Sequence, residues 1–229
     1  MSGREVAQTL FVPECVSELR SACVRPSIYR RYCKRPFDMA LSMTLLVLLM
    51  PLCVLICLLI RVGDGRPVLF RQVRVGRFGQ PFHILKFRTM FRGSDLGSSV
   101  TVAGDKRLTR VGRFLRKWKL DELPQLLNVL RGEMSMVGPR PDVPGFADRL
   151  SGVEKSLLEL RPGVTGPASL RYRDEDGILA LQADPERYNR EIVFPDKVRL
   201  NLGYARKMTF LGDIDYLLQT VLPVRKLAG

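Results

Sequence analysis

Two adjacent carboxylates, Asp121 and Glu122, are the side chains of this sequence best suited to chemistry. Acidic groups can hold Mg²⁺, which proteins commonly bind through one or two carboxylates together with substrate phosphates. A carboxylate can also attack phosphorus and form an acyl phosphate. The simpler alternative is that Asp121 caps a helix and Glu122 interacts with its dipole, which stabilises a helix by ~0.5–2 kcal/mol. The residues around the pair bear on this choice.

Basic side chains accompany the acidic pair. Lys86 and Arg88 lie on a predicted strand, and Arg140 lies between Pro139 and Pro141. Lysine and arginine in such settings bind phosphate groups. Together with the carboxylates they predict a site for a phosphorylated substrate and a divalent cation.

A β-hairpin should carry two of these cations. Residues 67–75 and 82–90 alternate partly between apolar and polar types, and a glycine-rich turn at 76–81 separates them. Two short runs joined by such a turn are typical of a hairpin. The Gly- and Ser-rich residues 93–104 predict a mobile loop.

A basic amphipathic helix is expected next, over residues 107–118. Its apolar side chains recur at helical spacing, with arginines and lysines between them. The apolar residues are Leu108, Val111, Leu115 and Trp118. This stripe either packs into the core or lies in the headgroup plane of a membrane, and the sequence leaves both open.

Residues 120–132 have the pattern of a further helix. Asp121 is a suitable N-cap, Pro124 is tolerated in a first turn, and Gly132 is a typical C-terminal stop. This helix would place the acidic pair at its beginning.

The rest of the chain alternates rigid loops and helices. Residues 137–141 must be extended, because each proline restricts itself and the residue before it. Residues 161–167, rich in Pro and Gly, predict another rigid loop. Helical patterns occupy 184–208 and 213–222.

An apolar segment over residues 39–60 contains no charge. A membrane span needs roughly 20 apolar residues, and a secretory signal has a shorter apolar region closer to the N-terminus. Pro51 lies near the middle and should break or kink the helix. Basic residues flank both ends, which favours keeping both ends in the cytoplasm. A re-entrant hairpin broken at Pro51 is therefore slightly favoured over a kinked single-pass helix.

The charge is unevenly distributed. Of the net charge of +14, nearly all lies in residues 61–119, directly after the apolar segment. Such a field attracts nucleic acid, anionic lipid headgroups or phosphorylated small molecules. Aromatic residues are not interleaved as stacking platforms, so nucleic acid is the weaker alternative. The chain has one His and five Cys, and all five Cys lie in its first quarter. They fit neither a zinc site nor a disulfide framework, and a reducing cytoplasm is favoured.

Several motifs occur in a specific order, and with them the chain resembles the bacterial sugar transferases, the small monotopic phosphoglycosyl transferases. The resemblance covers residues 30 to about 222. The motifs are Lys34-Arg35-Pro36-Phe37-Asp38, Lys86-Phe87-Arg88-Thr89-Met90, Leu120-Asp121-Glu122-Leu123-Pro124-Gln125, Asn128-Val129-Leu130-Arg131-Gly132-Glu133-Met134-Ser135, Val137-Gly138-Pro139-Arg140-Pro141 and Arg161-Pro162-Gly163-Val164-Thr165-Gly166.

The resemblance implies an activity and a location. Such enzymes move a sugar phosphate from a UDP-sugar to undecaprenyl phosphate and release UMP at the cytoplasmic face of the bacterial inner membrane. This step begins the synthesis of exopolysaccharide, capsule or a related glycan, which downstream glycosyltransferases would extend. A homodimer through the membrane segment or the tail stays open.

The resemblance also implies roles for single residues. Asp121 would be the nucleophile that forms a phospho-sugar–aspartyl intermediate, and it would lie near Mg²⁺ beside its dyad partner Glu122. Lys86, Arg116 and Arg140 match basic positions near the substrate phosphates. From the same motif as Lys86, Arg88 is a further candidate for binding substrate.

Two departures from the family pattern concern the membrane segment and the region after Gly166. Met50-Pro51 stands where relatives have Ser-Pro, and residues 167–175 differ from the usual run, so Arg171 and Arg173 are only candidate substrate contacts. The expected fold is α+β and mostly helical, with a small hairpin, a re-entrant helix and interfacial amphipathic helices. The expected divisions are an extension (1–28), a membrane-associated helix (29–62) and a cytosolic catalytic domain (63–229).

Overall fold

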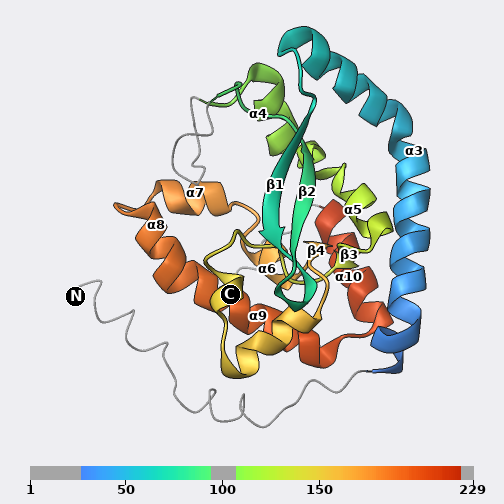
Figure 1. The fold of residues 1–229 in the computed structure, drawn as a ribbon, viewed down its shortest axis with the longest axis vertical. Helices are drawn as coiled ribbons and strands as arrows, with labels where there is room; N and C mark the ends of the chain where they lie inside the picture. Colours follow the sequence, from blue (N-terminus) through green and yellow to red (C-terminus); the bar gives the residue numbers. More distant parts are fainter. Residues whose placement is uncertain (1–26, 94–106, 223–229) are drawn as a thin grey trace.

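The computed structural model describes residues 27–93 and 107–222 (Figure 1). The strands are β1 (Leu69–Val75), β2 (Pro81–Phe87), β3 (Ser135–Val137) and β4 (Gly163–Thr165). The α-helices are α3 (Lys34–Gly63), α4 (Arg110–Lys117), α5 (Gln125–Arg131), α6 (Pro167–Arg171), α7 (Glu175–Ala180), α8 (Pro185–Tyr188), α9 (Phe194–Lys207) and α10 (Phe210–Val221). Shorter 3₁₀ or π turns are η1 (Tyr29–Cys33), η2 (Arg77–Gly79), η3 (Leu120–Glu122), η4 (Ala147–Arg149), η5 (Gly152–Glu159) and η6 (Asn189–Val193). The chain is mostly helical with two small sheets, as expected, and the loop predicted over 93–104 falls almost entirely outside the described residues.

Helix α3 packs one side against the rest of the molecule along most of its length. In its first half, the buried Ser42 hydroxyl donates a hydrogen bond of 2.8 Å to the Leu126 carbonyl at α5. In its second half, Ile56 and Ile60 pack with Leu115 of α4 in a separate apolar cluster. Both halves of α3 therefore pack against the globular part of the protein, the first against α5 and the second against α4.

Of the break or kink expected at Pro51, the structure shows a bend without a break, because α3 stays helical through this residue. Proline still lacks the amide that would bond the carbonyl four residues earlier, and such positions bend helices. Figure 1 shows that the axis of α3 changes direction between its two halves, with the second half turning towards α4. The sequence therefore encodes a bent helix rather than two separate ones.

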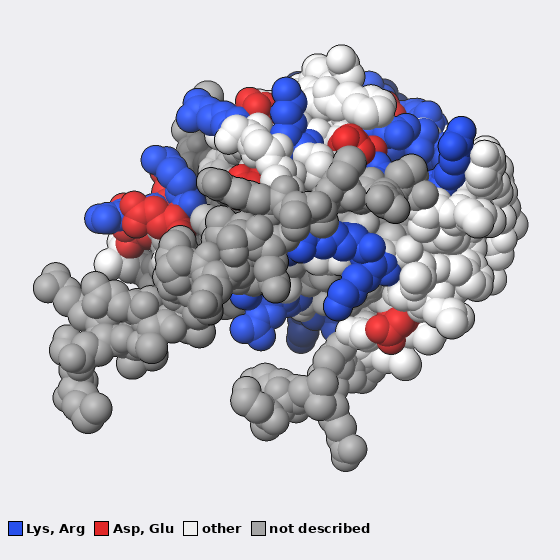
Figure 2. Space-filling view, turned by 90° about the horizontal axis from the view of Figure 1, so that it is seen from below, with Lys and Arg blue, Asp and Glu red and all other residues white. Residues whose placement is uncertain are grey.

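The outer side of α3 is apolar and uncovered. Over Tyr29–Gly63 the helix is long and apolar enough to cross a membrane by length and composition, yet only 11% of its most apolar window is buried. The exposed residues include Met43, Val47, Leu48, Val54, Leu55 and Leu58. Figure 2 shows uncharged residues over the side where α3 lies, with Lys and Arg gathered beside it.

The predicted hairpin is confirmed. Strands β1 and β2 pair antiparallel, with Leu69 opposite Phe87 and Val75 opposite Pro81. The first half of β2 alternates exposed and buried residues, with Phe82 and Ile84 buried, and its second half is buried on both faces, at Leu85 and Phe87 as well. The buried Asn128 of α5 fixes the hairpin in place, because its side chain accepts from the Leu85 amide at 3.0 Å and donates to the His83 carbonyl at 2.8 Å.

The basic helix is also confirmed, as α4, with the Thr109 side chain capping its start by accepting from the Gly112 amide at 2.9 Å. The next prediction is wrong in part, because Asp121 does not cap a helix. It lies inside the single turn η3, and α5 begins only at Gln125. Gly132 ends α5 with φ +86°, as predicted.

A second, parallel pair of strands replaces the rigid loop predicted over 161–167. Ser135 of β3 pairs with Gly163 of β4, and Val137 pairs with Thr165. The two backbones approach so closely that a Cβ at Gly138 would lie 2.6 Å from the Arg161 carbonyl oxygen. Glycine at this position permits the pairing, and the extended segment predicted at 137–141 follows directly.

The helices predicted in the tail are confirmed as α8 to α10, and the tail locks the start of α3. Lys34 forms a 2.7 Å ion pair with the fully buried Asp213 of α10. The same carboxylate accepts hydrogen bonds of 2.7 Å from Tyr29 and from Tyr204 of α9. Two regions far apart in sequence, the start of α3 and the pair α9–α10, therefore meet at one buried charge.

Candidate functional site

The acidic pair lies where β2, η3 and the segment after β3 meet. Lys119 adopts a left-handed conformation with φ +56°, which turns the chain from α4 into η3. Leu120 and Leu123 pack on the apolar cluster under α3, and they anchor the turn on both sides of Asp121 and Glu122. The pair is therefore held on a tight turn fixed by apolar contacts.

Glu122 is the anion of a compact ion cluster. Its Oε1 lies 2.8 Å from Nη2 of Arg140 and 3.1 Å from Nζ of Lys86. Burial alone would raise the pKa of Glu122, but Arg140 and Lys86 outweigh it and hold the pKa far below its usual range. Glu122 therefore stays ionised and orients two cations.

Asp121 has a different environment although it is the next residue. Its side chain is 5% exposed, and its Oδ1 is buried without a hydrogen-bond partner among the described residues. Burial raises the pKa of Asp121; Lys86 opposes the shift and the neighbouring Glu122 adds to it. An unpartnered buried carboxylate oxygen is energetically costly, which marks Asp121 as the group open to a ligand.

The acidic side chains of this site could bind a metal ion only together with a bound substrate. Within residues 27–93 and 107–222, no group of three His, Cys, Asp or Glu side chains could hold a metal by itself. Asp121 offers one free oxygen, whereas Glu122 is occupied by two cations. Such a site suits Mg²⁺ shared with substrate phosphates, the arrangement in which the protein supplies one or two carboxylates.

Arg140 is positioned by strand β1. The Val75 amide donates a 2.9 Å hydrogen bond to the Asp142 carbonyl, and Nη1 of Arg74 donates one of 3.1 Å to the Pro141 carbonyl. These bonds hold the Pro139–Asp142 segment beside the hairpin that carries Lys86. Sequence reasoning did not identify Arg74, because nothing local in β1 marks it as a support for a residue 66 positions away.

The remaining predicted cations divide into two groups. Arg116 of α4 joins the site, because it is one of the charges that lower the pKa of Asp121, and its Nη1 lies 3.8 Å from Asp176 of α7. Arg88 does not join, since its Nη2 bonds the carbonyls of Asp64 and Gly65 after α3.

The two arginines after Gly166 lie apart from the cluster. Arg171 ends α6 and is exposed. Arg173 is exposed and donates to the Thr220 carbonyl at the end of α10. This contact of Arg173 therefore connects the segment after α6 with the end of α10.

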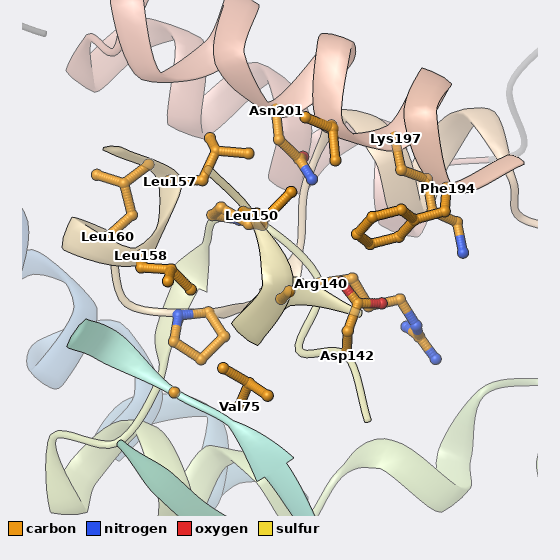
Figure 3. Close-up of a pocket in the computed structure, with 15 residues that line it drawn as sticks. Val75, Arg140, Asp142, Leu150, Leu157, Leu158, Leu160, Phe194, Lys197 and Asn201 are labelled. Carbon is orange, nitrogen blue, oxygen red and sulfur yellow. The ribbon is translucent and has the colours of Figure 1, made fainter. Parts of the chain in front are cut away.

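A second charged layer, which sequence reasoning missed, lies behind Arg140. Lys197 of α9 binds both carboxylate oxygens of Glu175 at 2.7 and 2.8 Å. Burial raises the pKa of Asp142 to about 6, and Lys197 and Arg74 only partly oppose this. Figure 3 shows Arg140 and Asp142 on one side of a pocket and Lys197 on the other. Only the spatial meeting of β1, the Pro139–Asp142 segment and α9 reveals this layer.

Comparison with known proteins identifies the family. The family described as "Bacterial sugar transferase" matches residues 29–226. The chain is 48% identical over 193 residues to a "UDP-glucose:undecaprenyl-phosphate glucose-1-phosphate transferase" of Caulobacter vibrioides, covering 82% of this chain and 68% of that protein. It is 37% identical over 234 residues to the "Exopolysaccharide production protein ExoY" of Rhizobium meliloti, covering 95% and 93%.

A third relative has a different sugar in its name. The chain is 38% identical over 200 residues to a "UDP-N-acetylgalactosamine-undecaprenyl-phosphate N-acetylgalactosaminephosphotransferase" of Aeromonas hydrophila, covering 86% of this chain but only 44% of that protein. The match to the family, over residues 29–226, includes α3, the hairpin, the acidic pair and the helices that hold them. The chain therefore belongs to the bacterial sugar transferase family.

Proposed function

We propose that this protein is a phosphoglycosyl transferase that moves a sugar phosphate from a UDP-sugar to undecaprenyl phosphate and releases UMP. One observation carries the proposal: a buried carboxylate oxygen of Asp121, without a partner in the described part of the chain, lies beside a cluster of cations suited to phosphate. The relatives named for this reaction give it its substrates. Initiation of exopolysaccharide synthesis is the corresponding role in the cell.

The reaction proceeds in two displacements at one phosphorus atom. In the first, an Asp121 oxygen attacks the phosphorus that carries the sugar, and the bond to the bridging oxygen breaks, so that UMP leaves with the electron pair. In the second, a phosphate oxygen of undecaprenyl phosphate attacks the same phosphorus and displaces Asp121. No net proton is consumed in either step, and the two substrates use one site in turn.

The neighbouring residues hold charge in place during both steps. Lys86 and Arg140 are fixed by Glu122, so they present preorganised cations to the phosphate oxygens. Arg116 adds a further positive charge near Asp121. Asp121 would hold Mg²⁺ together with the donor, and the ion would supply positive charge against the diphosphate.

Helix α3 supports attachment to one side of a membrane. Its inner side is held by α5 and by the Ile56–Leu115 cluster, whereas its outer side exposes Val47, Leu48 and Leu58. A helix fastened to the globular part in both halves dips into one leaflet more readily than it crosses the bilayer. We place the enzyme at the cytoplasmic face of the inner membrane, where the phosphate of a polyprenyl lipid and a soluble UDP-sugar meet.

The test is UMP release from a panel of UDP-sugars with undecaprenyl phosphate and Mg²⁺. Wild type should release UMP with at least one donor, and both Asp121→Asn and EDTA should abolish release. Asp215→Asn removes a carboxylate from the exposed face of α10 and should leave activity unchanged. Release that persists in Asp121→Asn would exclude Asp121 as the nucleophile, and failure of wild type to bind any UDP-sugar would contradict the transferase.

A further inference from the structure

A pocket lies next to the ion cluster of Glu122, Lys86 and Arg140, and Arg140 is part of both. Arg140 and Asp142 form one edge, and Phe194, Lys197 and Asn201 project into it from α9 (Figure 3). Leucines from the segment around η5 line the remaining wall. The pocket therefore combines an apolar interior with a polar end that faces the phosphate-binding cations.

Asn201 supplies an unused polar group inside this pocket. The residue is 6% exposed, and its Oδ1 is buried with no hydrogen-bond partner in the described part of the chain. Figure 3 shows its side chain pointing from α9 into the pocket. A buried carbonyl oxygen of this kind normally has a partner, so the site is built to receive a donor from a bound molecule.

Arg140 connects the pocket to the chemistry. It lines the pocket, and its Nη2 is bonded to Glu122 beside Asp121. A nucleotide whose phosphates lie at Arg140 can place the group at its other end, the base, in the neighbouring cavity. The apolar walls suit the faces of a flat ring, and a single amide suits its polar edge.

We propose that this pocket binds the uracil base of the UDP-sugar, with Asn201 contacting the ring edge. The inference rests on the proposed function for the identity of the donor. Uracil carries an N–H between two carbonyl groups, so Oδ1 of Asn201 accepts from the ring N–H while Nδ2 donates to an adjacent carbonyl. Leu157, Leu160 and Phe194 enclose the ring.

The test separates base recognition from phosphate recognition. Binding of UMP and of ribose 5-phosphate, which lacks the base, is measured by calorimetry on the full-length protein in detergent. Wild type should bind UMP more tightly, and Asn201→Leu should reduce that preference by at least about tenfold while leaving ribose 5-phosphate binding unchanged. Asn189→Leu, in η6 outside the pocket lining, is the matched control and should keep the preference.

Folding is followed in parallel by thermal unfolding. Asn201→Leu removes an unpaired buried polar group, so its melting temperature should equal or exceed that of wild type; if it does not fold, Asn201→Ala carries the same comparison. An unchanged UMP preference in the folded variant would overturn the base pocket and leave the transferase intact. If wild type binds no UMP at all, the proposed function fails together with the pocket.

Discussion

Asp121 and Glu122 are adjacent in sequence but have opposite environments. Glu122 accepts from two cations that hold it ionised, whereas Asp121 keeps a buried oxygen without a partner within the described structure. Glu122 is paired with two cations, whereas the described residues leave one oxygen of Asp121 open to a ligand. Because of this difference, we expect substitutions of the two residues to change protein stability differently.

The first prediction concerns stability at this pair. Glu122→Gln leaves Lys86 and Arg140 without their buried anion and should lower the free energy of unfolding by about 3 kcal/mol. Asp121→Asn removes a charge whose burial is unfavourable and should leave stability equal or slightly higher. Thermal unfolding of both variants in detergent checks this, and equal destabilisation by the two would show that the environments are not different.

A second prediction concerns pH. The pKa of Asp142 is raised to about 6 in the folded protein by burial, and its ordinary value is 3.8. The native state therefore holds this proton more tightly than the unfolded state, so the contribution of Asp142 to stability is present below pH 4 and is lost as pH rises to about 6. Asp142→Asn should flatten the pH dependence of the melting temperature over that window. A profile that is unchanged in the variant would contradict the assignment.

At the scale of elements, the patterns with strong local signals were predictable. Alternation marked the hairpin, and helical spacing marked α4 and the tail helices. Strands β3 and β4 were not predictable, because each has three residues and their pairing depends on the close backbone approach at Gly138. The cap predicted at Asp121 was wrong because Leu120 and Leu123 fasten η3 to the cluster under α3, which separates this turn from α5.

The candidate site was predictable where its residues lie in motifs. Asp121, Glu122, Lys86 and Arg140 were identified from the sequence, and the structure brings them together. The supporting contacts from β1 and α9 have no such signal, because they depend on which elements meet in three dimensions. Arg88 belongs to the same motif as Lys86 but lies apart from the cluster, because β2 ends at Phe87 and the Arg88 side chain reaches the turn after α3.

The third prediction concerns the buried ion pair between Lys34 of α3 and Asp213 of α10. Asp213→Asn should lower the free energy of unfolding by about 3 kcal/mol, because Lys34 then remains buried without its closest anion. Lys34→Met in the Asp213→Asn background should cost little more, since the unpaired charge is gone. A double-mutant cycle measured by thermal unfolding tests the coupling, and additive effects of the two changes would contradict it.

At the scale of the whole molecule, one side is apolar and the adjoining region is basic. The apolar outer side of α3 lies beside Lys and Arg side chains (Figure 2), an arrangement that attracts anionic headgroups to the edge of an exposed apolar surface. The turn that carries Asp121 and Glu122 is held close to that surface, because Leu120 and Leu123 pack on the same cluster as Ile56 and Ile60 of α3.

The fourth prediction is that both ends of α3 face the cytoplasm. Single cysteines replacing Ser27 and Arg66, in a background without native cysteines, should resist a membrane-impermeant thiol reagent in intact spheroplasts and react after lysis. The same result is expected for a control cysteine at the exposed Asp215, which lies in the globular part. Labelling of one end but not the other in intact spheroplasts would establish a single-pass helix.

The most direct test of the account is to trap the covalent intermediate. Purified protein is mixed with Mg²⁺ and an active UDP-sugar in the absence of undecaprenyl phosphate, and its intact mass and the released UMP are measured together. We expect a mass increase of one phospho-sugar, with one UMP released for each modified protein, and neither product in Asp121→Asn. If UMP appears only when the lipid acceptor is present and no adduct forms, the sugar phosphate is transferred directly and Asp121 is not the nucleophile.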